Sequence, residues 1–173
     1  HLYYPGTSGL LTPDHFQFEG SRARILHLGL PGLHEQMDKP WNGDPSGWVT
    51  VLKGARAAGI KTNLEMCSLP APRLLEVVAP CLGHLDYLII NDFEVAALSK
   101  RPIRHGEDVD LRDCLANAKD VFDRSSVELL VVHFPRGAIA MQRGADPLVI
   151  PSVAVPKEAL SLIHISEPTR RPI

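Results

Sequence analysis

Asn91 and Glu94 are the residues whose types and spacing offer the clearest chemistry. They directly follow a largely hydrophobic run, residues 85–90, and begin a helical pattern. Ligands of open α/β sheets bind at the carboxyl ends of the strands, and side chains three positions apart on a helix face the same way. An amide oxygen and a carboxylate there suit a hydrated Mg²⁺ that also contacts phosphates. The same spacing also predicts a capping box, with Asn91 as N-cap and Glu94 at N3.

Strand and helix patterns alternate along the chain, which predicts a largely parallel sheet with right-handed crossovers. The expected strands are residues 24–30, 60–66, 84–90 and 127–133, with a hairpin at 138–143 and 148–153. The expected helices are residues 47–58, 72–79, 92–100 and 111–123, while 34–46 is expected to be a polar loop and 1–4 a further strand. The strand at 127–133 consists mostly of Val and Leu, so we expect it to be buried on both faces.

The order of three strand-end motifs resembles that of a known family. A strand ending in NLE (63–65) precedes the one ending in NDFE (91–94), and VELLVVHF (127–134) follows, with Arg136, Gly137 and Ala138 after it. This order is similar to that of the ribokinase-like sugar kinases of the phosphofructokinase-B type, over about residues 22–155. The resemblance implies a three-layer α/β/α, Rossmann-like fold with a mostly parallel sheet, of which this chain holds only part.

The resemblance implies ATP-dependent phosphorylation of a sugar or sugar-like alcohol. In that family an Asn-x-x-Glu motif helps to organise Mg²⁺ and the nucleotide phosphates, and it matches Asn91 and Glu94 here. The family's segment near the phosphates and the sugar matches Asn63 here. The alternative interpretation is that Asn63 only caps the end of its strand. The family's nucleotide-side turn matches His133 and Gly137: the histidine would bond phosphate or only backbone, and the glycine would let the backbone approach the nucleotide closely. Because members of that family often form dimers, the resemblance also allows a homodimer.

Both ends of the chain lead us to expect a fragment. The chain begins at His1 without a Met, and residues 160–170, LSLIHISEPTR, resemble the translation of a common transposon-type sequencing adapter. We therefore interpret residues 1–159 as a partial kinase domain and 160–173 as a non-native tail. The family's Gly-Ala-Gly-Asp segment, whose aspartate activates the sugar hydroxyl, is not in the sequence. No catalytic residue is assigned, and we expect no kinase turnover and some exposed apolar surface.

Composition narrows the class of protein. A net charge of −2 argues against a nucleic-acid-binding or anionic-membrane protein, and no apolar run approaches the ~20 residues of a membrane span. Cys67, Cys81 and Cys114 lack CxxC spacing, which is typical of reduced thiols in a cytoplasmic protein.

Two other functions stay open. One is a non-catalytic nucleotide- or sugar-binding or regulatory module on the same fold, because the NLE and HFPRG segments depart from the family pattern. The other is a different nucleotide- or sugar-handling Rossmann-like enzyme, such as a transferase.

Overall fold

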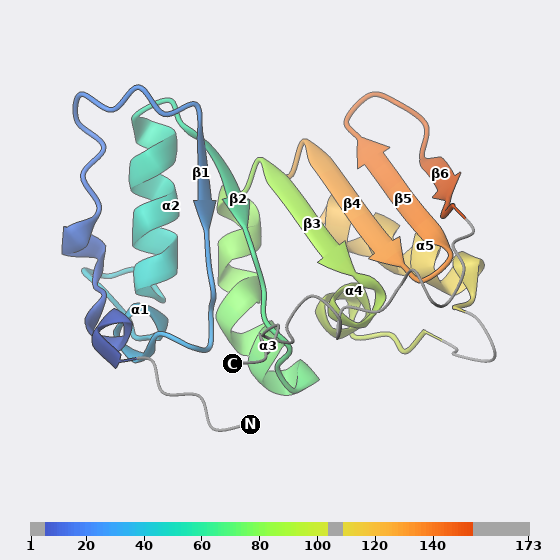
Figure 1. Ribbon diagram of the computed structural model, residues 1–173, viewed down its shortest axis with the longest axis horizontal. Coiled ribbons are helices and arrows are strands. Elements are labelled where there is room, and N and C mark those ends of the chain that lie inside the picture. Colours follow the sequence, from blue (N-terminus) through green and yellow to red (C-terminus); the bar gives the residue numbers. More distant parts are fainter. Residues whose placement is uncertain (1–5, 104–108, 154–173) are drawn as a thin grey trace, which may run out of the picture.

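The protein is built on one six-stranded sheet with its strands in the order β1 to β6 (Figure 1). The computed structural model describes residues 6–103 and 109–153, so the expected strand at 1–4 and the tail at 160–173 lie outside the described residues. The strands are β1 (Ile25–Leu28), β2 (Lys61–Leu64), β3 (Tyr87–Asn91), β4 (Leu129–Phe134), β5 (Gly137–Gln142) and β6 (Leu148–Pro151). The first four are parallel, and the last two form the expected antiparallel hairpin.

The helices lie in the connections between the strands. They are α1 (Glu35–Asp38), α2 (Gly47–Ala57), α3 (Ala71–Val78), α4 (Asp92–Ser99) and α5 (Leu111–Asp123), with 3-10 turns η1 (Gly6–Leu10), η2 (Pro13–His15) and η3 (Ala79–His84). Polar caps account for where α2 and α5 begin: the Ser46 side chain accepts from the N–H of Val49, and the Asp110 side chain accepts from the N–H of Arg112. None of the helices in the described part of the chain is long and apolar enough to cross a membrane.

Helix α1 was wrongly expected to be part of a loop. It is held by tertiary contacts: Met37 is fully buried, and the Asp38 carboxylate accepts hydrogen bonds from Gly32 N, Trp48 Nε1 and Arg73 Nη2 at 2.9, 2.8 and 2.7 Å. One buried carboxylate thus joins the loop after β1 to α2 and α3. The expected strand at 84–90 also begins later, because His84 still belongs to η3.

The core lies between the sheet and the helices that cover one of its faces. Figure 1 shows α3, α4 and α5 behind the sheet. Alternate strand residues point toward them and are fully buried, among them Leu64, Leu88, Ile90, Leu130, Val132 and Ile139. This alternation follows from the period of two in a β-strand.

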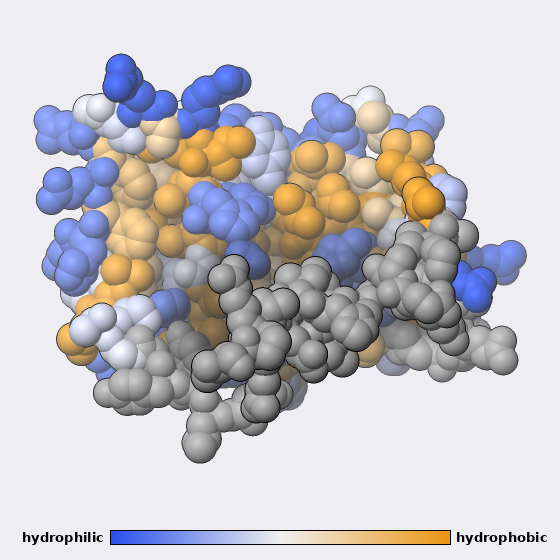
Figure 2. Space-filling view, viewed as in Figure 1, coloured by the Kyte–Doolittle hydropathy of each residue, from blue (hydrophilic) through white to orange (hydrophobic). Residues whose placement is uncertain are grey.

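Apolar residues are exposed on the opposite face of the sheet. Ile89 in β3 is 51% exposed and Ile25 in β1 is 55% exposed, and Figure 2 shows hydrophobic residues along this face. In β4 only every second residue is fully buried, with Leu129 and Val131 half-buried. The expectation that this strand is buried on both faces was therefore wrong, whereas the expected exposed apolar surface is present.

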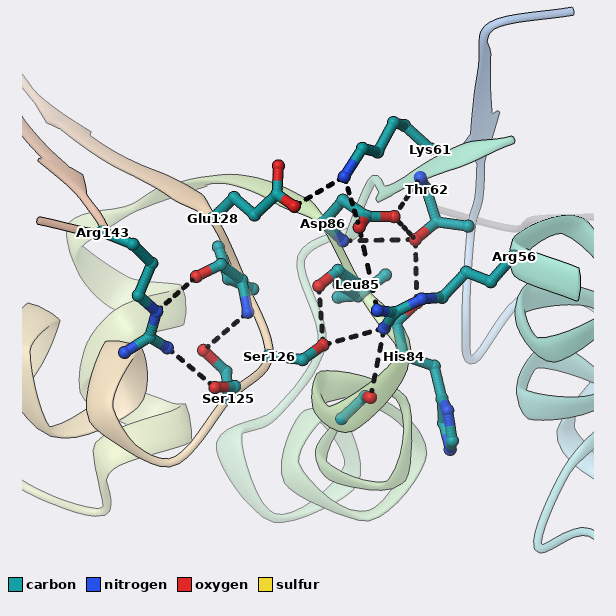
Figure 3. A network of polar contacts seen from close by, with 12 residues as sticks. Arg56, Lys61, Thr62, His84, Leu85, Asp86, Ser125, Ser126, Glu128 and Arg143 are labelled. Carbon is teal, nitrogen blue, oxygen red and sulfur yellow. Dashed lines mark hydrogen bonds and ion pairs between the residues drawn. The ribbon is translucent and has the colours of Figure 1, made fainter. Parts of the chain in front are cut away.

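A polar network holds together the amino-terminal ends of the strands (Figure 3). The buried Asp86 carboxylate accepts from the Thr62 N–H at 2.9 Å and the Thr62 hydroxyl at 3.0 Å, and it pairs with Lys61 at 3.3 Å and Arg56 at 3.8 Å. Burial by itself raises the pKa of Asp86, but these bonds and charges outweigh it and hold the pKa below the usual aspartate value. The network lies at the end of the sheet opposite to the candidate site.

Candidate functional site

The carboxyl ends of the parallel strands meet along one edge of the sheet, the lower edge in Figure 1. Asn91 ends β3 and is the register partner of His133 in β4. Helix α4 starts directly after Asn91, so Glu94 lies on its first turn at the same edge. The structure therefore brings together Asn91, Glu94 and His133, three of the residues singled out in the sequence.

Asn91 and Glu94 form the predicted capping box. The N–H of Glu94 donates to Asn91 Oδ1 at 2.9 Å, and the N–H of Asn91 donates to Glu94 Oε2 at 2.8 Å. These two bonds satisfy backbone donors that the helix itself leaves free. Glu94 Oε1 accepts no hydrogen bond from the described residues, so one carboxylate oxygen remains for another contact.

The surroundings of Glu94 raise the pKa of its carboxylate. Burial raises its pKa, the bond from Asn91 N and the proximity of His133 lower it, and the charges of Asp92 and Glu65 raise it again. The net pKa lies above the usual glutamate value. A pocket of about 340 Å³ adjoins Glu94 and is lined also by Asn91, Phe93 and Ser68.

His133 and Gly137 flank this edge in different ways. His133 is exposed near the end of β4, where it is available for hydrogen bonding. Gly137 is buried as the first residue of β5, after a two-residue turn at Pro135 and Arg136. A Cβ at Gly137 would lie 2.5 Å from the carbonyl oxygen of Ile150 in β6, so strand packing explains this glycine. A close approach of nucleotide to Gly137 stays a prediction.

Asn63 is the penultimate residue of β2, toward the carboxyl end of its strand as expected, but it is not level with Asn91. Its register partner in β3 is Tyr87, four residues before Asn91, which sets Asn63 back by about 13 Å along the strand direction. Its Nδ2 donates to His27 Nδ1 at 2.7 Å, while its buried Oδ1 has no hydrogen-bond partner among the described residues. The hydrogen bond of its side chain within the described residues is thus to another side chain and not to the backbone.

His27 and Glu65 are polar residues of this region to which the sequence analysis assigned no role. His27 Nε2 lies 2.9 Å from Glu65 Oε2, across 38 positions of sequence. The signal that could have found them is their alternation: both sit at positions whose neighbours Leu28 and Leu64 face the core. Strand periodicity therefore places both polar side chains on the face opposite the core.

The described residues hold no group of three His, Cys, Asp or Glu side chains arranged to bind a metal. Cys67, Cys81 and Cys114 are free thiols, and burial raises the pKa of Cys81 to about 12 and that of Cys114 to about 11. Any divalent cation at this edge would therefore be shared with a ligand, as hydrated Mg²⁺ is shared with phosphates.

No family model and no curated protein matches the sequence. Solved structures do match the fold. Escherichia coli phosphofructokinase-2 in complex with fructose-6-phosphate is 16% identical with a TM-score of 0.58, and the match covers 85% of this chain and 43% of that chain. Thermotoga maritima 2-dehydro-3-deoxygluconokinase is 14% identical with a TM-score of 0.61, covering 80% and 44%. Staphylococcus aureus pyridoxal kinase is 11% identical with a TM-score of 0.52, covering 70% and 42%.

These matches show a ribokinase-like α/β fold, as the order of motifs indicated. The match covers less than half the length of each of these three kinases.

Proposed function

We propose that the edge formed by Asn91, Glu94 and His133 binds the Mg²⁺ and nucleotide phosphates of a kinase that phosphorylates a hydroxyl of a sugar or sugar-like alcohol, with ATP as the donor. The shared fold supports a kinase, because all three structures compared above are kinases. The position of the residues supports the site, because α/β sheets bind their ligands at the carboxyl ends of strands.

The observation that carries the proposal is the environment of Glu94. One of its oxygens is tied to the backbone of Asn91, which orients the carboxylate, and the other accepts no hydrogen bond from described residues. The carboxylate is half-buried beside a pocket of about 340 Å³. Mg²⁺ typically binds proteins through one or two carboxylates while keeping several waters and phosphate oxygens, so Glu94 fits such an ion.

The other site residues have complementary roles in this proposal. Asn91 holds Glu94 in place, and Mg²⁺, when bound, would offset the charge of the phosphates. His133, exposed beside Asn91, donates a hydrogen bond to phosphate. Gly137 lets the backbone beside the β4–β5 turn approach the nucleotide closely, and Asn63 serves the acceptor side from farther back on the sheet.

Phosphoryl transfer also needs a base for the acceptor hydroxyl, and we assign that role to no residue of this chain. The division into a partial kinase domain at 1–159 and a non-native tail at 160–173 belongs to the same proposal. We expect the 173-residue chain to bind Mg²⁺ and nucleotide without turnover.

The experiment is a calorimetric titration of ATP into the 173-residue chain, with and without Mg²⁺. Binding that needs Mg²⁺ and weakens at least tenfold in Glu94→Gln supports the proposal. Binding that ignores both Mg²⁺ and the substitution contradicts it. A parallel assay of sugar-dependent ADP release must stay at background if the chain lacks turnover.

The completed capping box favours one second candidate, a non-catalytic binding module, because it gives Asn91 and Glu94 a structural reason to be present. Restoring a Gly-Ala-Gly-Asp segment from a related kinase distinguishes the two. Turnover then supports a kinase, and continued inactivity with intact nucleotide binding supports the module.

A further inference from the structure

A groove of about 730 Å³ lies between helices α3 and α4, which pack side by side behind the sheet (Figure 1). Its volume is more than twice that of the pocket beside Glu94 and is within the ~300–1,000 Å³ range of small-molecule sites. The walls are mostly apolar, with Leu75 from α3, Phe93 and Ala96 from α4, and Ile103 after α4. The groove therefore has the size and the lining to hold an apolar small molecule.

Small side chains of α4 account for the space, and an exposed aromatic ring borders it. Ala96 and Ala97 both line the groove and are only partly buried. Phe93, one turn earlier in α4, is 67% exposed and lines both this groove and the pocket beside Glu94. Aromatic side chains contribute strongly to binding where a partner buries them, so an exposed phenylalanine at a concave apolar surface indicates a ligand site.

Two cationic residues lie at the end of this groove. The N–H of Lys100 donates to the carbonyl of Ala97 and that of Arg101 to the carbonyl of Ala96, both at 3.3 Å, and these bonds end α4. Both cationic residues line the groove and are exposed, and neither side chain forms an ion pair with a described carboxylate. No Asp or Glu is among the described residues that line the groove. This positive charge favours an anionic group in the ligand.

The two ends of the groove differ in charge, which gives the ligand a direction. Phe93 is on the first turn of α4 beside Glu94, whereas Lys100 follows the last residue of the helix. A helix of 8 residues is about 12 Å long. Because Glu94 repels an anion, a bound molecule should carry its charge at Lys100 and Arg101 and extend its apolar part toward Phe93.

We propose that this groove binds an amphipathic carboxylate, a small molecule with a hydrocarbon chain and one carboxylate group at its end. Lys100 and Arg101 bind the carboxylate, and the walls formed by Leu75 and Phe93 bury the chain. Burial of the chain supplies most of the attraction, and the two cations select the charge of the ligand. The proposal goes beyond the proposed function and does not rest on it.

The test uses two probes with chains of similar length and opposite charge, decanoate and decyltrimethylammonium. Binding of each to the 173-residue chain is measured by calorimetric titration below micellar concentrations and at low salt, where charge effects are least screened. We expect saturable binding of decanoate, about tenfold tighter than that of decyltrimethylammonium, because two exposed cations attract one probe and repel the other. Equal affinities, or no saturable binding of decanoate, would overturn the proposal.

Charge reversal tests the role of the two cations. The double variant Lys100→Glu/Arg101→Glu should reverse the preference, so that decyltrimethylammonium binds more tightly than decanoate. The matched control is Arg22→Glu/Arg24→Glu, because these arginines are also exposed and without an ion pair to a described carboxylate, and they precede β1. The control changes the net charge equally and should keep the wild-type preference. A preference that both double variants keep, or that both reverse, contradicts the proposal.

Filling the groove tests where the chain binds. Ala96 lines the groove but not the pocket beside Glu94, so Ala96→Trp should weaken the binding of both probes by about tenfold or more. Ile89→Ser is the control, because Ile89 is 51% exposed on the opposite face of the sheet; it should leave binding unchanged. Weaker binding in Ile89→Ser alone would place the probes on that face and overturn the proposal. Circular dichroism checks the fold, and the exposed charge variants decide the question if Ala96→Trp unfolds.

Discussion

Asn91 and Glu94 each cap the other: the side chain of each accepts a hydrogen bond from the backbone N–H of its partner, at 2.9 and 2.8 Å. The arrangement begins α4 and at the same time orients a half-buried carboxylate beside a pocket at the carboxyl edge of the sheet. The structural role in beginning α4 and the proposed binding role therefore fall on the same two side chains.

Two substitutions of Glu94 distinguish its roles. Gln at N3 still completes a capping box, so Glu94→Gln should change the free energy of unfolding by less than about 0.5 kcal/mol. Glu94→Ala removes the cap and should cost about 1 kcal/mol. Both should lose Mg²⁺-dependent nucleotide binding. Urea unfolding and calorimetry measure the two effects, and an unchanged Mg²⁺ response in both variants would reduce Glu94 to a helix cap.

Mg²⁺ binding should fail at a higher pH than an ordinary glutamate would allow. Burial is the main cause of the raised pKa of Glu94, so its proton competes with the ion as the pH falls through a value above about 4.3. Because the folded protein binds the proton of Glu94 more tightly than the unfolded chain does, protonated Glu94 stabilises the fold. This contribution to the free energy of unfolding is lost as the pH rises through the folded pKa. Mg²⁺ titrations from pH 4 to 7 check this, and a binding midpoint at or below the ordinary glutamate pKa contradicts it.

Asp86 should control stability in acid. Its folded pKa is below the ordinary value because hydrogen bonds from Thr62 and nearby cations outweigh the effect of burial. Its contribution is therefore present above about pH 4 and lost as the pH falls through the folded pKa. Asp86→Asn should lower the free energy of unfolding by about 1–3 kcal/mol at pH 7 and make it depend less on pH in acid. The Glu128 carboxylate is half-exposed, so Glu128→Gln should leave the pH dependence in acid nearly unchanged.

Gly137→Ala should destabilise the β4–β5–β6 hairpins. The new methyl group would meet the Ile150 carbonyl oxygen at 2.5 Å, and such overpacking costs about 1–3 kcal/mol. Gly83→Ala is the control, because a Cβ at that position has nothing within 4 Å. Thermal melts of the two variants compare them directly. Equal melting temperatures would show that β6 can shift to accommodate the methyl group without loss of stability.

The capping residues and the alternation of strands and helices could be predicted from the sequence. Helix α5 has the predicted bounds, and the Asn91–Glu94 capping box was one of two predicted interpretations. These features depend on residues within a few positions of one another, so local periodicity and side-chain chemistry suffice to determine them.

Only the tertiary structure decided which polar residues come together. The register of β3 and β4 places Asn91 beside His133, while the register of β2 sets Asn63 back beside Tyr87. The pairing of His27 with Glu65 spans 38 positions, and α1 depends on contacts of Asp38 with residues from other segments. Register between distant strands is set by the packing of the whole sheet, and a four-residue helix has too few internal hydrogen bonds to form alone. The position of each residue in the chain therefore could not reveal its neighbours in the site.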